Sequence, residues 1–167
     1  MKTFIVDGYN FAHAIPEFSK SLEKNLQAGR DALVKACMQY VSGRAHAFRI
    51  VIVFDGSDRF ADMPSFDAPG LSVIFTASRE KADDRILEMI QETKRPEDFF
   101  IVSDDNYVFN HSRSLRARGV TCAEFYAGLT RKKDDAKNKA VTREKPALRE
   151  DIARKITEEY KRRLGIP

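Results

Sequence analysis

Acidic side chains stand at or just beyond the ends of several apolar stretches in this 167-residue chain. They fall in four separate segments: Asp7, Asp55, Glu80 with Asp83 and Asp84, and Asp104 with Asp105. Carboxylates gathered at one place repel one another by kilocalories unless a cation neutralises them. Oxygen donors with few histidines or cysteines favour Mg²⁺ or Mn²⁺ over zinc. If the fold brings the four segments together, the pattern predicts a divalent metal site.

A carboxylate-held metal ion suits phosphodiester hydrolysis, because it lowers the pKa of a bound water and neutralises the leaving oxygen. The predicted catalytic set is Asp7, Asn10, Glu80, Asp83, Asp104 and Asp105. Within it, Asp7, Asp83 and Asp104 are predicted as direct or water-mediated metal ligands. The Asn10 amide is of a type that holds a scissile phosphate or an outer water.

Each of these acids also has a structural interpretation. A single aspartate at a strand end is most often a turn residue or a helix cap. Asp55 is the most ambiguous, since it precedes a glycine and Asp-Gly is a plain turn signal. Asp84 is interpreted as a cap or a solvent-facing residue. His13 and His111 are interpreted as surface or packing residues and are left out of the site.

Short stretches rich in Val, Ile and Phe predict four strands and a weaker fifth, at 3–6, 49–54, 71–75, 98–102 and 120–125. Apolar residues at helical spacing predict helices over about 22–40, 82–90 and 107–117. Gly, Asp and Pro make 55–70 a predicted exposed loop. This alternation is typical of an α/β fold, with a central, mostly parallel sheet flanked by helices. Parallel strands end at one edge of the sheet, so all four acidic segments are expected there.

The chain changes character after residue 128. Residues 1–128 are predicted as one domain, and 129–146 as a basic and polar linker that includes Arg131, Lys132 and Lys133. Residues 147–167 place one apolar stripe on a strongly charged background, which predicts an amphipathic C-terminal helix. We expect this helix to dock either on the domain or on a partner.

Composition indicates a soluble cytoplasmic protein with no membrane segment. The formal net charge is +4 and the pI is near 9.1, a balance that suits RNA or another polyanion but also ordinary solubility. The two cysteines form no Cys-x-x-Cys pair, as expected for free thiols in a reducing compartment. The chain reaches Asp7 too early for a signal peptide, and no apolar run approaches the ~20 residues of a membrane span.

Several of these segments together resemble the NYN domains of the PIN-like nuclease superfamily, and most closely their YacP-like branch. The first strand and its end, Phe4-Ile5-Val6-Asp7-Gly8-Tyr9-Asn10, resemble the opening signature of the family. Val53-Phe54-Asp55-Gly56 resembles the end of the family's second strand. Phe75-Thr76 followed by Glu80-Lys81-Ala82-Asp83 resembles its Phe-Thr and Glu-x-Ala-Asp segments, and Val102-Ser103-Asp104 matches its Val-x-Ser-Asp in part.

The resemblance covers about residues 3–126. It implies a single PIN-like (Rossmannoid) domain with a Mg²⁺ or Mn²⁺ site and endonucleolytic hydrolysis of RNA. For the YacP-like branch it further implies cleavage of messenger RNA on ribosomes. By resemblance, the metal site belongs to Asp7, Asp83 and Asp104, with Asn10, Glu80 and Asp105 in support.

Two other functions compete with the ribonuclease hypothesis. A nuclease-derived RNA-binding or ribosome-binding module with little activity is favoured by the basic linker, but a pure polyanion binder has no reason to keep an acidic rim. A phosphatase of the haloacid dehalogenase type carries a second aspartate two residues after the first. Here that position is Tyr9, which disfavours the phosphatase.

Overall fold

The computed structural model describes residues 1–42, 44–45, 47–56, 66–77 and 80–130. Its helices are α1 (Gly8–Ala14), α2 (Pro16–Lys24), α3 (Leu26–Val41), α4 (Ala82–Glu92) and α5 (Asn106–Ser114), with a short 3₁₀ helix η1 (Pro96–Asp98). Its strands are β1 (Lys2–Asp7), β2 (Phe48–Phe54), β3 (Phe66–Ala68), β4 (Leu71–Phe75), β5 (Phe99–Val102) and β6 (Arg118–Val120). Residues 122–130 form one more helix.

The strands form one sheet in the order β3-β4-β2-β1-β5-β6, and only the β3–β4 pair is antiparallel. The chain leaves β1 toward β2 and β4, and later returns to the other side of β1 with β5 and β6. Strand order therefore reverses next to β1. In open α/β sheets a crevice forms at such a reversal, outside the carboxyl ends of the strands. The predicted α/β fold with a mostly parallel sheet is confirmed.

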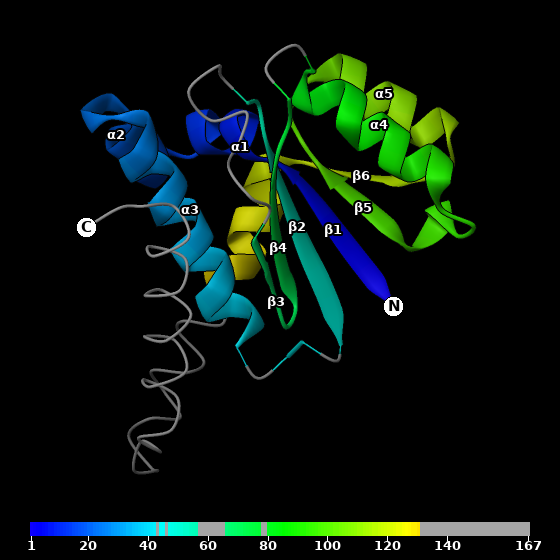
Figure 1. Cartoon of the computed structure of the whole chain (residues 1–167), viewed down its shortest axis with the longest axis horizontal. Coiled ribbons are helices and arrows are strands. Elements are labelled where there is room, and N and C mark those ends of the chain that lie inside the picture. The colour runs from blue at the N-terminus through cyan, green and yellow to red at the C-terminus, as the bar shows by residue number, and fades with distance from the viewer. Residues whose placement is uncertain (43, 46, 57–65, 78–79, 131–167) are drawn as a thin grey trace.

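Helices cover both faces of this sheet (Figure 1). On one face, α1, α2 and α3 pack over a large core that includes Phe11, Phe18 and Leu33. On the other face, α4 and α5 pack over a smaller core that includes Ile86 and Val108. Opposite faces are used because right-handed crossovers that run in opposite directions along a sheet place their helices on opposite sides.

The helix predicted over 22–40 is two helices. Asn25 separates α2 from α3 with an extended backbone (φ −171°, ψ 159°), and its side-chain oxygen accepts a hydrogen bond from the Ala28 N–H at 2.7 Å. An asparagine in this role ends one helix and caps the next. The apolar spacing continues across the junction because both helices pack on the same core.

The strand predicted over 120–125 was wrong. The last strand is β6, which ends at Val120, and a helix begins directly after Thr121. The Thr121 hydroxyl accepts from the Glu124 N–H at 3.2 Å, and the Glu124 carboxylate accepts from the Thr121 N–H at 2.9 Å. This reciprocal capping box fixes a helix start where β-forming residues had suggested a strand. The preceding helix stops at Ser114, and Arg116 takes a left-handed φ of 69°.

The stretch 55–70 is not entirely a loop. Its end forms β3, whose buried Phe66 pairs with Val73 at the edge of the sheet. Residues 57–65, the larger part of the predicted loop, lie outside the described residues. Residues 129 and 130, predicted as the start of the linker, belong to the last helix, and the rest of the linker and the predicted C-terminal helix lie outside the described residues. In the part of the chain that the structure describes, no helix is long and apolar enough to cross a membrane.

Candidate active site

Asp7 lies at the edge of the sheet where the four acidic segments were expected, and we call the acids at this edge, Asp7, Asp55, Asp83, Asp104 and Asp105, the acidic rim. It is the last residue of β1 and the N-cap of α1, and it is only 5% exposed. Its carboxylate accepts a hydrogen bond from the Asn10 N–H at 3.2 Å and another from the Ser103 hydroxyl at 3.3 Å. The chain turns into α1 immediately, at Gly8, where a Cβ atom would lie 2.4 Å from the Phe54 ring. These contacts hold one carboxylate in a fixed place at the end of the central strand.

The environment of Asp7 opposes its negative charge. The pKa of this carboxyl is raised from 3.8 to about 7, mainly by burial and also by repulsion from Asp83 and Asp55. The hydrogen bonds from Asn10 and Ser103 act in the opposite direction. A buried carboxyl that shares its neighbourhood with two others is a group that a cation would stabilise strongly in its ionised form.

Asp83 belongs to the same electrostatic group. It lies in the first turn of α4, and its pKa is raised by partial burial and then by the charges of Asp105, Asp55 and Asp84, while Lys81 lowers it. These interactions link side chains from β1, α4, the end of β2 and the start of α5. Acids from four separate segments thus act electrostatically on one another at this edge of the sheet.

Asp55, ambiguous in the sequence, has a definite position. Its carboxylate accepts a hydrogen bond at 2.6 Å from the N–H of Ala82, the first residue of α4. Lys81, the N-cap by position, makes no side-chain cap. Asp55 therefore caps α4 from a neighbouring strand end and fixes the helix that carries Asp83. Its charge also acts on Asp7 and Asp83, so it contributes to the acidity of the rim.

Asp104 is tied to the rim through Asn10. The Asp104 N–H donates to the Asn10 side-chain oxygen at 2.8 Å, and the Asp104 carboxylate accepts from the Cys122 N–H at 2.9 Å. The Cys122 thiol also donates to the Asn10 oxygen, at 3.5 Å. Burial and the charge of Asp104 raise the pKa of this thiol to about 12, so it stays protonated and acts as a donor. One carboxylate oxygen of Asp104 is thus engaged in holding the helix that begins at Cys122.

Asp105 and Glu80 have structural partners of their own. The Asp105 carboxylate caps α5, accepting from the N–H groups of Tyr107 and Val108 at 2.8 and 3.0 Å. Glu80 accepts from the Ala77 N–H at 3.4 Å. Asp105 still acts electrostatically on Asp83, whereas Glu80 is not among the groups that shift Asp7 or Asp83.

Two buried hydroxyls also lie at these strand ends, and neither was among the predicted site residues. Ser103 joins Asp7 to the start of α5, since its oxygen also accepts from the Asp105 N–H at 3.1 Å. Thr76 donates to the Glu80 carbonyl at 2.6 Å and accepts from the Gly56 N–H at 2.9 Å, which joins the ends of β2 and β4. Both hydroxyls directly follow a strand, and that position was the available signal.

The donor set fits Mg²⁺ or Mn²⁺ in chemistry, because it consists of carboxylate oxygens whose mutual repulsion a cation relieves. Among the described residues, however, no three His, Cys, Asp or Glu side chains lie close enough together to hold an ion directly. Mg²⁺ is commonly held by one or two carboxylates and keeps several waters. Asp7 and Asp83 are two carboxylates whose charges interact at this edge of the sheet.

Comparison with known proteins shows the family to which the chain belongs. The family model of the YacP-like NYN domain matches residues 4–165. The chain belongs to the YacP-like NYN domain family. The family is of the nuclease type, and the NYN domain here has the corresponding nuclease-like fold.

Individual relatives come from Bacillus subtilis. The YacP protein of strain 168 is 30% identical over 91 residues, which are 54% of this chain and 52% of that protein, so the match spans about half the length of the relative. The crystal structure of Rae1 (YacP) has a TM-score of 0.66 at 24% identity and covers 99% of this chain and 96% of that one. Its W164L mutant gives 0.64 at 22% identity, over 93% and 92% of the two chains. At this identity the structures support the fold of the NYN domain.

Proposed function

We propose that this NYN domain is a metal-dependent endoribonuclease that hydrolyses phosphodiester bonds of RNA. The observation that carries the proposal is the buried Asp7 carboxyl, whose pKa is raised to about 7 next to Asp83 and Asp55. A protein that only bound RNA would gain nothing from acids that repel phosphates. Acids that hold a divalent cation are consistent with catalysis on an anionic substrate.

Asp7 and Asp83 would hold the metal, with Asp104 contacting it through water. When bound, Mg²⁺ or Mn²⁺ supplies an activated water and neutralises charge on the phosphate and the leaving oxygen. The burial of Asp7 excludes water from one side of this carboxylate and fixes its direction. Ser103 and the Asn10 N–H keep the Asp7 oxygens in place by hydrogen bonding.

The Asn10 side chain can offer N–H donors to a substrate, because its hydrogen bonds among the described residues use only its oxygen. Its oxygen must be the atom that accepts from the Asp104 N–H and the Cys122 thiol, because both of these groups donate. The amide nitrogen is then left with two N–H groups. We assign them to a phosphate oxygen of the substrate or to a water next to it, which would orient the scissile phosphate over Asp7.

A double substitution tests the assignment. Asp7→Asn combined with Asp104→Asn should abolish Mn²⁺-dependent cleavage of a stem-loop RNA while the circular dichroism spectrum stays that of the folded protein. Glu23→Gln, an exposed change on α2, is the control and should cleave as the unmodified protein does. Unchanged cleavage by the double variant would show that these acids are not the site. RNA binding without metal-stimulated cleavage by the unmodified protein would select the binding-module alternative.

The setting of the reaction is a proposal based on the family. We propose that the substrate is messenger RNA on the ribosome, in the cytoplasm, where thiols such as the buried Cys37 and Cys122 remain reduced. Co-sedimentation of the protein with translating ribosomes at physiological salt tests this part. If the protein stays at the top of the gradient but cleaves free RNA, the ribonuclease proposal stands and the ribosome proposal is rejected.

A further inference from the structure

An exposed aromatic side chain stands beside the acidic rim. Tyr107 is 51% exposed and lies in the first turn of α5, two residues after Asp105 and three after Asp104. Its N–H donates to the Asp105 carboxylate at 2.8 Å, so its backbone is fixed to the same strand end that carries the acids. Among the described residues only two other large apolar side chains, Met1 and Leu26, are as exposed. Neither of them adjoins the rim in sequence.

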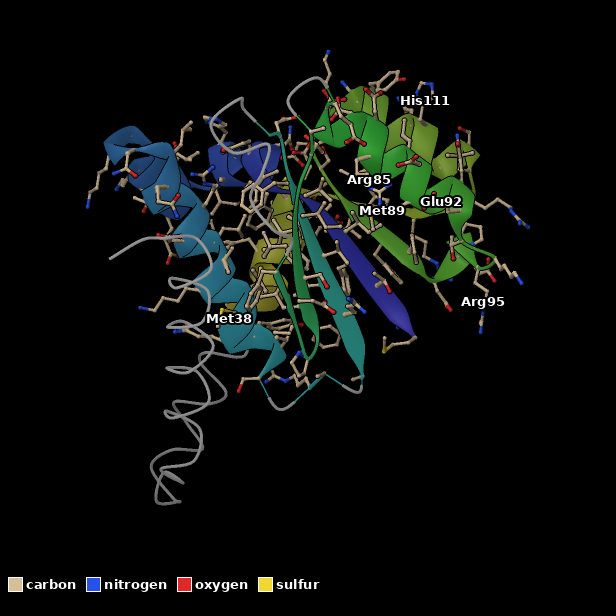
Figure 2. All side chains as sticks on the ribbon, viewed as in Figure 1. Met38, Arg85, Met89, Glu92, Arg95 and His111 are labelled. Atoms are coloured by element: carbon tan, nitrogen blue, oxygen red, sulfur yellow. The ribbon has the colours of Figure 1, made fainter. Side chains whose placement is uncertain are left out.

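His111, one turn along α5, extends the Tyr107 ring into a broader surface. The two ring centroids lie 4.1 Å apart with 40° between the ring planes. The His111 Nδ1 atom lies 2.9 Å from the Tyr107 carbonyl oxygen, and since a carbonyl only accepts, Nδ1 carries the proton. Both side chains are exposed, and His111 lies on the outer side of α5 in Figure 2. We call these two side chains the Tyr107–His111 platform.

The platform contributes little to the fold. The core beneath α5 includes the buried Val108, and neither platform residue belongs to it. A large aromatic group held rigid and left in water is a surface suited to a flat ligand. The adjacent carboxylates select against an anionic group directly on the platform, whereas a neutral, planar nucleobase meets no such repulsion.

We propose that the Tyr107–His111 platform stacks one unpaired nucleobase of the RNA and so places the adjoining phosphate over the acidic rim. This inference rests on the proposed ribonuclease function and adds a determinant of substrate choice to the same site. A base can stack on a side chain only when it is free of its own helix, so the platform favours single-stranded segments over duplex. It reads the presence of a base more than its identity, because every base has a stacking face.

Binding without metal tests the platform separately from catalysis. A fluorescein-labelled single-stranded RNA of ten nucleotides is titrated in EDTA with the unmodified protein, Tyr107→Ala, Tyr107→Phe and Leu26→Ala. Leu26 is the matched control because it is also 51% exposed but starts α3, on the other face of the sheet. Tyr107→Ala should weaken binding about tenfold, as expected for loss of one stacked base, whereas Tyr107→Phe and Leu26→Ala should bind within twofold of the unmodified protein.

An RNA of the same length with abasic sites throughout provides the second arm. The unmodified protein should prefer the base-bearing RNA, and Tyr107→Ala should lose most of that preference. Equal binding of both RNAs by the unmodified protein, or unchanged binding by Tyr107→Ala, would overturn the platform. A surface meant for a protein partner would give this second result.

Cleavage kinetics then separate the two proposals. With Mn²⁺, Tyr107→Ala should raise KM about tenfold and leave kcat within threefold, because the acids and Asn10 are unchanged. If the unmodified protein cleaves RNA and Tyr107→Ala has the same KM, the platform is refuted and the ribonuclease proposal stands. Base-dependent binding in EDTA without any metal-stimulated cleavage refutes the ribonuclease and leaves the platform as an RNA-binding surface.

Discussion

Replacing Asp7 by asparagine should stabilise the folded protein at alkaline pH. The pKa of Asp7 is raised from 3.8 to about 7, so the folded state keeps a proton that the unfolded state has lost between these two values. The contribution of this carboxyl to the free energy of unfolding therefore falls as pH rises from about 4 through about 7. Each pKa unit corresponds to about 1.36 kcal/mol, which makes ionisation of the folded Asp7 carboxyl cost about 4 kcal/mol. An asparagine carries no charge and avoids this cost.

The substitution keeps the local hydrogen bonds. The asparagine oxygen can accept from the Asn10 N–H, and its amide nitrogen can donate to the Ser103 oxygen in place of the bond that Ser103 now donates. The difference in unfolding free energy between Asp7→Asn and the unmodified protein should thus be near zero at pH 4. It should grow to several kcal/mol in favour of the variant at pH 8.

Urea denaturation at pH 4, 6 and 8 without divalent metal measures this difference. Glu23→Gln is the control, since it removes an exposed carboxylate on α2 and should show no comparable pH dependence. At pH 8, adding Mn²⁺ should stabilise the unmodified protein and not Asp7→Asn, because binding to the folded state alone raises its stability. A difference between the two proteins that is constant with pH, or that favours the unmodified protein at pH 8, would refute the electrostatic account of the rim.

Three further outcomes follow from the packing and the caps. Gly56→Ala should destabilise the protein by about 3 kcal/mol in thermal unfolding, because a Cβ atom there would lie 1.7 Å from the Thr76 carbonyl oxygen. Gly128→Ala should stabilise the protein by about 0.5–1 kcal/mol, because nothing lies within 4 Å of the added Cβ atom and alanine favours a helix more than glycine does. Asp55→Ala should cost ~1 kcal/mol of stability through the lost cap on the Ala82 N–H, and Asp55→Asn, which keeps an acceptor, should cost less. Cys37, buried and with a pKa raised to about 12, should resist iodoacetamide at pH 8 until the protein is unfolded; rapid labelling under native conditions would contradict that burial.

Local pattern was sufficient for the main architecture. Strands such as β1 and β2 are apolar on both faces, which marks them as buried parallel strands wherever they lie in the sheet. Local pattern was insufficient where two element types share a spacing. Val120, Cys122 and Phe125 fit a strand and a helix equally well, and the capping box of Thr121 with Glu124 decides for the helix.

The sequence by itself determined which residues carry charge to the rim, since each acid follows or nearly follows an apolar stretch that can only be a buried element. Only the tertiary structure decided what each acid does there. Asp55, at the end of β2, caps α4, and Asp104 is joined to Asn10 and Cys122. Asp104 and Asn10 lie 94 positions apart in the chain. Burial and repulsion depend on distances in space, so the raised pKa of the Asp7 carboxyl had no local signature in the chain.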